Sequence, residues 1–349
     1  MTAPRILNLM LGAKPGGLES MARYYHGALE ARGARVLSVG LEGSWLERAL
    51  ADRPGGFAGM KATSPIDPRQ SWRLAAIARA FAPDVVLAHG SRGAGLAIPA
   101  LSGKGAPVVA VVHNFRARRA VARADLAIGV SRAVAADLSE RFPTTPVAVV
   151  ENFEPLDRTP PRAAMADPPR IGGLGRLHEE KGFDLLLDAA ALLRDRGRAF
   201  RLSIAGEGPA AADLKARSTR LGLDDRVDFP GWVTPASRLL SALDIFVCAS
   251  RPRAEAFPLV VFEAMAAGTP VIATDIEGPR EILQRGRYGR LVAPGSPEAL
   301  AQAIAAALDD RAGSLTIARL AQAEAIAPYE MAAGGERLWA ALAPLLEGR

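Results

Sequence analysis

Apolar runs of strand length alternate with longer amphipathic segments along most of the chain. In the first half, the apolar runs predict strands at Arg5–Met10, Arg35–Gly40, Asp84–His89, Pro107–Val112, Leu126–Val130 and Val147–Val150. Helical periodicity is clearest in Gly17–Arg32, and Ser131–Arg141 opens with a serine suited to an N-cap. Strands that alternate with helices in this way are typical of parallel α/β domains.

The pattern is interrupted by a proline-rich stretch at Glu151–Pro169, which we interpret as a linker. After it, strands are predicted at Arg170–Leu174, Arg201–Ala205, Val227–Phe229, Ile245–Cys248, Pro270–Thr274 and Gly289–Val292. A helix is predicted at Ser296–Asp309, with a serine N-cap followed by proline. The sequence therefore predicts two doubly wound Rossmann-like domains, residues 1–165 and 166–329. A helix over about residues 330–349 is expected to pack back on the first domain.

The composition fits two domains and argues against several classes of protein. With 349 residues, of which 49% are hydrophobic and 23% charged, the chain can bury two cores, and disorder is not expected. Cys248 is the only cysteine, so no internal disulfide can form, and its apolar surroundings indicate a buried core residue. The histidines lie far apart, at positions 26, 89, 113 and 178, so no metal site and no metal cofactor are expected.

The N-terminal apolar run Ile6–Gly12 is far shorter than the roughly 20 residues that span a bilayer. It also lacks the charged start and the cleavage site of a signal peptide. We therefore expect a cytoplasmic protein.

Positive charge is concentrated in the first half of the chain. Up to Met165 there are 21 Lys and Arg against 13 Asp and Glu, and beyond it 22 against 24. Such a surface would attract an acidic membrane, a phosphorylated acceptor or nucleic acid. An arginine-rich composition without functional meaning gives the same excess, so both interpretations stay open.

Two glycine-rich segments follow predicted strands. Gly16 and Gly17 precede the first helix, where glycine lets the backbone approach a ligand and the helix N-terminus offers N–H groups to phosphate. A plain strand-to-helix turn explains them equally well. The second segment, Gly172–Gly175, is followed by His178 where the dinucleotide fingerprint needs glycine, which weakens an assignment as an NAD-dependent dehydrogenase.

Arg176 and Lys181 lie on the turn between the first strand and the first helix of the second half. The fork of an arginine and the point charge of a lysine together suit a diphosphate. They could also neutralise a departing nucleoside diphosphate. Taken alone, they could equally be solvated surface charges.

The sharpest candidate chemistry is a pair of glutamates eight residues apart. Glu255 lies on a loop and Glu263 within the following helix, among apolar neighbours where an unpaired charge is costly. Ribose hydroxyls would supply the hydrogen-bond donors that Glu263 needs. The helix start near Pro258, Leu259 and Val260 would direct free N–H groups toward phosphate or sugar.

In this region the chain resembles the retaining GT-B glycosyltransferases of family 4, the large group 1 glycosyl transferase family. Glu255 and Glu263 match the family's Glu-x7-Glu motif, and Ala264–Ala273 reads almost as its consensus. Four further segments match in order and at the family spacing: Gly175-Arg176-Leu177, Glu180-Lys181-Gly182, Ala205–Pro209 and Phe229–Val233. The match is strong over most of residues 165–300 and weak in the first half.

The resemblance implies a GT-B architecture, with two Rossmann-like domains facing a central cleft, and sugar transfer from a nucleotide-diphosphate sugar without a metal. It places the donor diphosphate at Arg176 and Lys181. It places the ribose at Glu263 and the transferred sugar at Glu255, which we expect to be catalytic.

The resemblance also implies further donor contacts. Backbone contacts would come from Phe257, Pro258, Leu259 and Val260. Gly16 and Gly17 would approach the phosphates from the first domain. The chain departs from the family at Pro258, because Gly-Phe-Gly is more usual there and proline removes one N–H.

His113 ends an apolar strand where many family members keep an active-site histidine, and we expect it to be catalytic. The crevice rule for doubly wound sheets predicts that it faces the ligand. His89 ends another strand and is a candidate contact with the acceptor. Without the family, each histidine would be interpreted as structural. Arg116 and Arg119 follow His113, where they would meet a phosphorylated acceptor or anionic lipid, or form a solvated helix face.

The sequence thus predicts a retaining glycosyltransferase that acts on a lipid-linked, lipopolysaccharide or other cell-envelope glycan, with a peripheral contact at the inner membrane face. One alternative is a GT-B epimerase or phosphorylase that binds a similar donor. Another is a non-catalytic protein that binds a polyanion or a nucleotide sugar. The two glutamates and two cations argue against a non-catalytic protein, and no nucleic-acid partner is expected.

Overall fold

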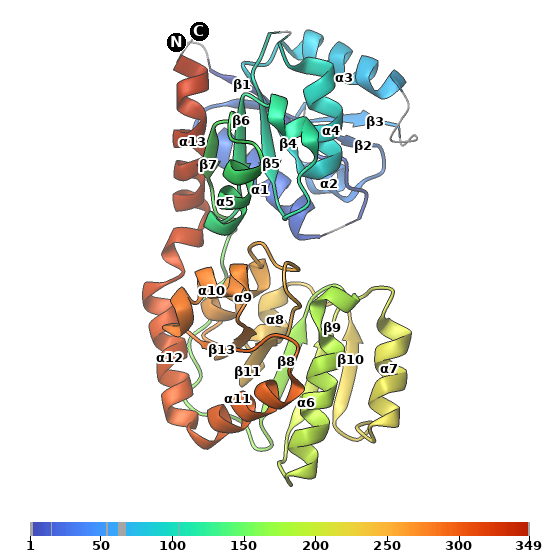
Figure 1. Ribbon diagram of the computed structural model, residues 1–349. Helices are drawn as coiled ribbons and strands as arrows, with labels where there is room; N and C mark the ends of the chain where they lie inside the picture. Colours follow the sequence, from blue (N-terminus) through green and yellow to red (C-terminus); the bar gives the residue numbers. More distant parts are fainter. Residues whose placement is uncertain (1–2, 15, 54, 62–67, 104, 348–349) are drawn as a thin grey trace. The chain divides into compact units, whose positions relative to one another are not determined.

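The computed structural model describes residues 3–14, 16–53, 55–61, 68–103 and 105–347 (Figure 1). The chain forms two compact units: residues 1–155 with 328–349 make up the first, and residues 156–327 the second. Each unit holds one parallel sheet with helices on both of its faces (Figure 1). The predicted doubly wound α/β class is therefore confirmed.

The first unit contains a seven-stranded sheet in the order β3-β2-β1-β4-β5-β6-β7. Its strands are β1 (Arg5–Leu9), β2 (Arg35–Leu41), β3 (Phe57–Met60), β4 (Val85–His89), β5 (Val108–Val112), β6 (Leu126–Gly129) and β7 (Val147–Val149). The apolar pattern predicts all of them except β3. This edge strand has four residues, two of them Ala and Gly, so it leaves no clear pattern in the sequence.

The helices of the first unit include one that comes from the end of the chain. They are α1 (Gly17–Glu30), α2 (Trp45–Ala49), α3 (Pro68–Phe81), α4 (Gly90–Leu101), α5 (Arg132–Arg141) and α13 (Met331–Glu347), with the 3₁₀ turns η1 (Arg119–Arg123) and η4 (Ala327–Tyr329). The predicted cap of α5 is confirmed, since Ser131 Oγ accepts from Val134 N at 3.1 Å. The α13 helix packs on α1, and a Cβ at Gly334 would collide with the ring of Phe153. Residues 348–349 of the expected terminal helix lie outside the described residues.

The second unit contains a six-stranded sheet in the order β10-β9-β8-β11-β12-β13. Its strands are β8 (Arg170–Leu174), β9 (Arg201–Ala205), β10 (Val227–Gly231), β11 (Ile245–Cys248), β12 (Val271–Thr274) and β13 (Arg290–Val292). Every one overlaps a predicted run. The inner strands β11 and β12 are fully buried apolar segments, as expected in a sheet covered on both faces, whereas the edge strands β10 and β13 are only partly buried.

Two groups of helices pack on this second sheet. The helices are α6 (Phe183–Asp195), α7 (Ala211–Arg220), α8 (Ala236–Leu240), α9 (Leu259–Ala266), α10 (Glu277–Ile282), α11 (Pro297–Asp309) and α12 (Arg311–Glu324), with the turns η2 (Glu179–Lys181) and η3 (Gln284–Gly286). One group joins α6 to α7 and α11, and the other joins α9 to α8, α10 and α12. The predicted N-cap of α11 is confirmed, since Ser296 Oγ accepts from Ala299 N at 3.1 Å.

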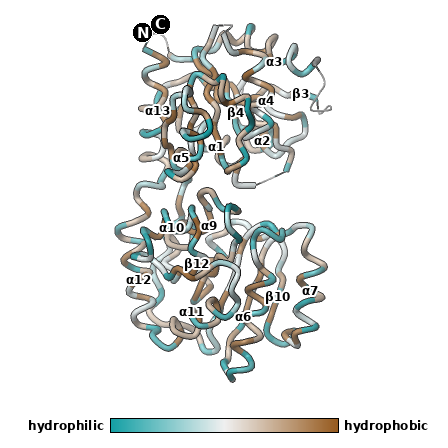
Figure 2. The backbone as a smooth tube through the Cα atoms, in the orientation of Figure 1, coloured by the Kyte–Doolittle hydropathy of each residue, from teal (hydrophilic) through white to brown (hydrophobic). Residues whose placement is uncertain are grey.

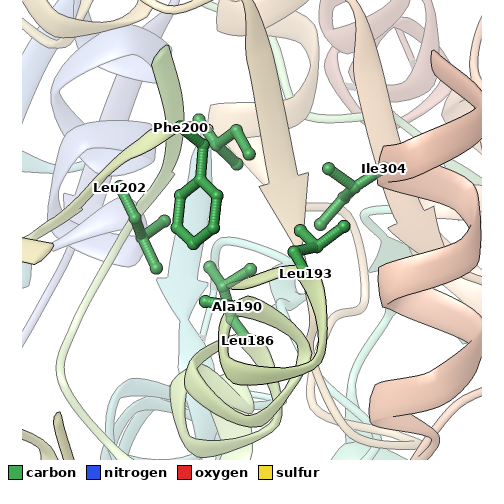
Figure 3. A pocket seen from close by; sticks show the side chains of 7 residues that line it. Leu186, Ala190, Leu193, Phe200, Leu202 and Ile304 are labelled. Atoms are coloured by element: carbon green, nitrogen blue, oxygen red, sulfur yellow. The ribbon is translucent and has the colours of Figure 1, made fainter. Parts of the chain in front are cut away.

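The core of the second unit is closely packed. The residues within strands such as β12 are hydrophobic (Figure 2). Leu186, Leu193, Phe200 and Ile304 point toward one shared space between the sheet and the helices (Figure 3). That space is too small for a water molecule, so it is packed interior and not a ligand cavity. The predicted buried Cys248 is confirmed.

The proline-rich stretch predicted as a linker belongs mostly to the second unit, which begins at Leu156 and not at residue 166. Arg162 Nη1 donates to Asp244 Oδ1 at 2.7 Å, and Ala166 N donates to the same oxygen at 3.1 Å. Asp244 is fully buried, so these donors are needed to compensate its charge. A composition shift alone does not reveal such hydrogen bonds.

Candidate functional site

Each sheet has a topological switch point, where the strand order reverses direction. In doubly wound sheets, ligands bind beyond the carboxyl ends of the strands that flank this point. The flanking strands are β1 and β4 in the first unit, and β8 and β11 in the second. Most of the predicted site residues follow these strands, in one group for each unit.

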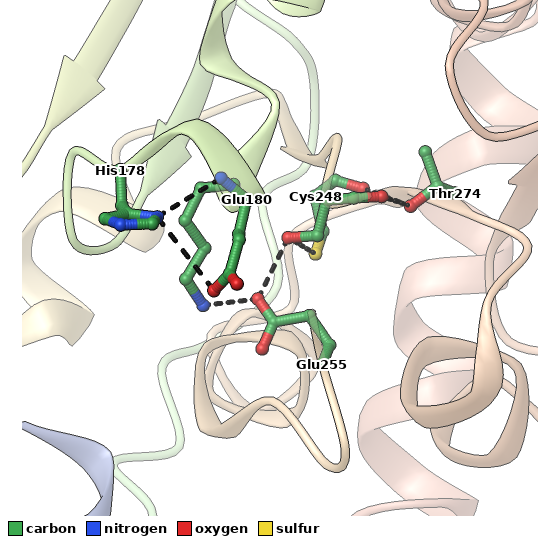
Figure 4. A network of polar contacts seen from close by, with 7 residues as sticks. His178, Glu180, Cys248, Glu255 and Thr274 are labelled. Carbon is green, nitrogen blue, oxygen red and sulfur yellow. Dashed lines mark hydrogen bonds and ion pairs between the residues drawn. The ribbon is translucent and has the colours of Figure 1, made fainter. Parts of the chain in front are cut away.

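In the second unit, the turn after β8 and the loop after β11 meet at the side chains of Lys181 and Glu255. Figure 4 shows Glu255 in this network of polar contacts. Lys181 Nζ donates to Glu255 Oε1, and Ser250 Oγ donates to the same oxygen at 2.9 Å. Thr274 Oγ1 donates to the Ser250 carbonyl at 2.6 Å, which ties the loop to the end of β12. The structure thus brings two predicted site residues into direct contact.

The buried Glu255 carboxylate keeps Lys181 charged and in place. Glu255 is 7% exposed, so its carboxylate depends on the donors around it. Burial by itself would lower the pKa of Lys181, but the Glu255 carboxylate outweighs it, and the pKa of Lys181 lies above its ordinary value. Lys181 is therefore positively charged at neutral pH. Nearby, desolvation raises the pKa of the Cys248 thiol to about 11, so this side chain stays neutral.

Backbone packing holds the turn after β8 in place. Leu177 N donates to Glu207 O at 2.8 Å, and Ala210 N donates to Leu177 O at 3.0 Å, so this turn pairs with the loop after β9. Gly182 has a φ of 66°, and a Cβ there would collide with the carbonyl oxygen of Ala249. Glycine therefore allows the turn to approach the loop after β11.

Arg251 fastens the loop that carries Glu255 to the start of α6. Its guanidinium donates to the two Asp184 oxygens at 2.9 and 2.7 Å, and to the Glu179 carbonyl at 2.6 Å. Partial burial favours the neutral acid, but the hydrogen bonds and charge of Arg251 outweigh it and hold the pKa of Asp184 below its ordinary value. This two-pronged contact fixes the backbone on which Glu255 stands.

Arg176 lies on the same turn as Lys181 and is exposed. No hydrogen bond or ion pair joins its side chain to another residue in the described ranges. The turn therefore carries one paired cation and one cation that is available to an external anion. A diphosphate contact for both stays a prediction.

The α9 helix begins directly after the loop that carries Glu255, with Pro258 as its N-cap. The amides of Leu259 and Val260 lie in the first turn and have no acceptor within the helix. Phe257 is 4% exposed, so its ring anchors the segment just before the helix. Pro258 contributes no N–H, so the backbone amides of Leu259 and Val260 are the hydrogen-bond donors at the N-terminus of α9.

Glu263 stands in α9 among buried apolar residues, and no hydrogen bond or ion pair reaches its carboxylate from the described part of the chain. Burial, with the nearby carboxylate of Asp157 as a second cause, raises the pKa of Glu263 to about 7. Asp157 accepts a hydrogen bond from Ser237 Oγ at 3.0 Å. Hydroxyl donors from a ligand would stabilise the ionised form of Glu263.

In the first unit, the side chains of Asn8, His89 and His113 form a hydrogen-bonded row across the ends of β1, β4 and β5. Asn8 Oδ1 lies 2.8 Å from His89 Nε2, and His89 Nδ1 lies 3.1 Å from His113 Nε2. His89 is 1% exposed, whereas His113 is half-buried. Because both ring nitrogens of His89 have partners, the predicted contact of His89 with an acceptor has no free nitrogen to use.

The row is held by aromatic packing and carries no charge. The ring of Tyr25 meets His89 edge-on with centroids 5.0 Å apart, and it stacks on Phe153 at 5.3 Å. Burial, with His113 as a second cause, lowers the pKa of His89 well below its ordinary value. Burial also lowers the pKa of His113 to about 4. Both imidazoles are therefore neutral at neutral pH.

Gly16 and Gly17 lie at the start of α1, and Pro15 before them lies outside the described residues. The carboxylate of Glu19 lies next to Gly12 and Gly16, where a Cβ on either glycine would press against it. A phosphate at these glycines would therefore have to displace a carboxylate. Their contact with the donor stays a prediction.

Arg116 and Arg119 are both exposed, on the segment that follows His113. This segment is anchored through its backbone, because Arg116 N donates to Asn114 Oδ1 at 2.9 Å and Ser91 Oγ donates to Arg116 O at 2.9 Å. The arginine side chains are thus presented on an ordered stretch of surface. A role in acceptor binding stays a prediction.

The sequence did not single out the supporting residues Asn8, Ser250, Arg251 and Thr274. Asn8 had a visible signal, because it is a polar residue inside the apolar run that forms β1. Ser250 follows the apolar run of β11, but nothing in its spacing shows that it donates to Glu255. In the described ranges, no three or more His, Cys, Asp or Glu side chains are grouped so that they could hold a metal ion. None of the helices described is long and apolar enough to cross a membrane.

Comparison with known proteins agrees with these motifs. A family model described as Glycosyl transferases group 1 matches residues 168–310, and one described as Glycosyltransferase Family 4 matches residues 15–158. The lipopolysaccharide core biosynthesis glycosyltransferase LpsE of Rhizobium meliloti is 30% identical over 301 residues, which cover 83% of this chain and 85% of that protein. The alpha-D-kanosaminyltransferase of Streptomyces kanamyceticus is 32% identical over 179 residues, which cover 51% of this chain and 46% of that protein, about half of each.

Among solved structures, the Anabaena protein HepE in complex with UDP and glucose matches with a TM-score of 0.85 at 23% identity. The match covers 98% of this chain and 100% of HepE, and it shows that the fold is shared. The match to LpsE extends over most of both chains, and the family models cover segments of both units. The chain therefore belongs to glycosyltransferase family 4, the glycosyl transferases group 1, and is a glycosyltransferase of the GT-B type.

Proposed function

We propose that this glycosyltransferase takes its sugar from a nucleotide-diphosphate sugar and transfers it, with retention, to a glycan or glycolipid of the cell envelope. The observation that carries the proposal is the Lys181–Glu255 pair at the switch point of the second unit, on the same turn as Arg176, whose side chain has no partner among the described residues. The nucleotide-sugar donor is supported by the complex of HepE with UDP and glucose. The acceptor class is supported by the name of the relative LpsE, a lipopolysaccharide core enzyme.

The donor would be held by charge at its diphosphate and by hydrogen bonds at its sugars. Arg176 and Lys181 would bind the diphosphate together with the amides of Leu259 and Val260. The segment Phe257–Pro258 would position these amides. The transferred sugar would contact Glu255.

The ribose hydroxyls would donate to Glu263, which has no donor of its own in the described structure. From the first unit, Gly16 and Gly17 would approach the donor phosphates once Glu19 moves aside.

Transfer breaks the bond between the anomeric carbon and the diphosphate oxygen and forms a bond from an acceptor hydroxyl oxygen to the same carbon on the same face. The acceptor hydroxyl gives up its proton to the departing diphosphate. Negative charge grows on the departing nucleoside diphosphate. Lys181 is already charged and fixed by Glu255, so it stabilises this charge without having to reorganise. With cations and helix amides at the diphosphate, the proposal needs no metal ion. His113 would contact the reacting sugar or the acceptor.

The acceptor would be bound by the basic first half of the chain. Arg116 and Arg119 are exposed on an ordered segment close in sequence to His113, which suits a phosphorylated glycolipid. The same positive surface would favour a peripheral contact with an anionic membrane at its cytoplasmic face.

The test is a panel of UDP-, GDP- and ADP-linked sugars, read by thermal shift and by donor hydrolysis. The variants are Glu263→Ala and, as a matched control, Glu336→Ala, because Glu336 is 75% exposed on α13. We expect one donor class to stabilise the wild type and the control, and to lose this effect in Glu263→Ala. No stabilisation by any donor, together with salt-sensitive binding to polyanions, would contradict the proposal.

A further inference from the structure

In the hydrogen-bonded row of Asn8, His89 and His113, one group, the Ala22 carbonyl, determines which atoms donate and which accept. The Ala22 carbonyl can only accept, and the Asn8 side chain approaches it to 2.9 Å. The amide atom at that contact must therefore be Nδ2, which donates. The second hydrogen of Nδ2 goes to Ser38 Oγ at 3.0 Å, and a flipped Asn8 amide would set its oxygen against the Ala22 carbonyl oxygen, with no hydrogen between them. Asn8 thus presents its oxygen to His89.

The direction passes from Asn8 through both imidazoles. Asn8 Oδ1 can only accept, so His89 Nε2 must carry a proton and donate to it at 2.8 Å. A neutral imidazole has a single N–H, so His89 Nδ1 is bare and accepts. The atom that lies 3.1 Å from it, His113 Nε2, must therefore carry the proton of His113.

The second ring nitrogen of His113 has no partner among the residues that the structure describes. The described part of the structure contains no hydrogen bond to His113 Nδ1, and the ring is half-buried at the end of β5. A neutral His113 with its proton on Nε2 has a lone pair at Nδ1. That atom can accept a hydrogen bond, but it cannot donate one to a phosphate or a carbonyl oxygen.

We infer that Asn8 and His89 are positioning residues, which hold His113 as the Nε2–H tautomer so that its bare Nδ1 accepts a hydrogen bond from a hydroxyl group of the substrate. The tautomer itself follows from the row of contacts, and only the hydroxyl ligand rests on the proposed function. A sugar or acceptor hydroxyl is the group that fits. The neutrality that this assignment needs agrees with burial, which lowers the pKa of His113 to about 4.

Packing prevents the row from rearranging. Tyr25 meets His89 edge-on, which fixes the plane of the His89 ring. On the far side of Asn8, Ser38 Oγ also lies 2.9 Å from His26 Nδ1, in an environment where burial lowers the pKa of His26 to about 4. Asn8 is therefore enclosed by partners on all of its polar atoms, as an anchor of hydrogen-bond direction must be.

The direct test is nitrogen NMR on protein labelled with ¹⁵N-histidine, recorded near neutral pH without any substrate. The chain has four histidines, and His113→Asn identifies the signals of His113 by their loss. We expect a protonated Nε2 and an unprotonated Nδ1 on His113. An Nδ1–H tautomer, an imidazolium or a mixture of tautomers would overturn the inference. Because no donor is present, this result is independent of whether the proposed function holds.

The second test removes the anchor with Asn8→Leu, which keeps the branched shape and deletes the amide. We expect His113 to lose its single tautomer, and kcat to fall by about 10- to 100-fold, as for other supporting residues. The donor KM should change far less. The control is Arg48→Leu, which removes an exposed hydrogen bond to the Gly43 carbonyl at 2.7 Å elsewhere in the first unit, and it should keep both the tautomer and kcat.

A folded Asn8→Leu protein with wild-type kcat, despite a changed tautomer, would overturn the role of Nδ1. If Asn8→Leu does not fold, the test uses His89→Gln instead. Glutamine ends in a single amide, which cannot bridge Asn8 and His113 as the two opposite ring nitrogens of His89 do. We expect the same loss of tautomer and of kcat. Unchanged values in folded His89→Gln would overturn the positioning role.

Discussion

The two units hold their candidate functional groups by opposite means. In the first unit, His113 is positioned by a neutral row of side chains, whose order is set by the direction of its hydrogen bonds. In the second unit, Lys181 and Glu255 hold each other by charge, with Ser250 as a neutral third partner. Both arrangements are largely buried, and both stand beside a switch point of their sheet.

The two arrangements would be disrupted by different changes. A row of neutral side chains depends on geometry, because a displaced ring loses its hydrogen bond and no long-range charge attraction remains to hold it. A buried ion pair depends on its partner, because removing one charge leaves the other uncompensated. The first site should therefore respond to packing changes, and the second to changes of charge and pH.

The largest effect is expected from Lys181→Met. This substitution removes the positive charge. Of the two described donors to Glu255, Lys181 and Ser250, only Ser250 remains. We expect kcat to fall by about 100- to 1,000-fold, the usual loss for one group that stabilises charge in the transition state. The measurement is steady-state kinetics, with Arg198→Met as control, since Arg198 forms an exposed pair with Asp309. A loss below tenfold would place the diphosphate elsewhere.

A packing change in the first unit comes next. A Cβ in Gly334→Ala would press on Phe153, which stacks on Tyr25, which in turn meets His89 edge-on. We expect the free energy of unfolding to fall by about 3 kcal/mol, as for overpacked cores. Denaturant unfolding measures it. Gly27→Ala is the control, because its Cβ would make only ordinary contacts, 4.0 Å from Arg53 and Met331, and alanine favours the helix. Equal stabilities would show that α13 adapts freely.

Glu263→Gln should separate charge from shape in the second unit. The pKa of Glu263 is raised from 4.5 to about 7, so ionising it costs folding free energy as the pH rises from 4.5 through 7. We expect the variant to match the wild type below pH 4 and to be more stable by about 3 kcal/mol at pH 8. Urea unfolding at several pH values tests this, with Glu336→Gln as control. A difference that does not depend on pH would refute the charge argument.

The smallest effect is expected from Arg251→Ala. Its pair with Asp184 is about a third exposed on both sides, so its loss should cost less than about 1 kcal/mol of stability. The loop that carries Glu255 would become less constrained, and the donor KM should rise by about threefold. High salt should shrink the difference from the wild type. An effect as large as that of Lys181→Met would mean that Arg251 itself touches the donor.

The sequence predicted the architecture well because both sheets are covered on their two faces. Each buried strand is then an apolar run, and only the four-residue edge strand β3 escaped. Lys181 and Glu255 were predicted separately, from motif and residue type. Their contact could not be predicted, because it depends on the pairing of β8 with β11, which are far apart in the chain.

The row behind His113 shows the opposite case. Asn8 receives contacts from α1, β2 and β4, through Ala22, Ser38 and His89. In a periodicity analysis, a polar residue in an apolar run is only an irregularity, because the pattern contains no information on partners from three other elements. Its meaning appears only when the helix and the neighbouring strands are placed around it.

Because α13 belongs to the first unit, the second unit can fold before the first during synthesis, although it is translated later. Residues 156–327 are one continuous stretch, so the second unit can close as soon as they have emerged. The first unit must wait for residues 328–347, which include Gly334 against Phe153 and the Tyr329 carbonyl that accepts from Glu154 N at 3.0 Å. When only residues 1–327 have emerged, the chain thus carries all of the second unit and a first unit whose α1 face is still uncovered. The part of the enzyme that is translated first is the last to become protected from chaperones and proteases.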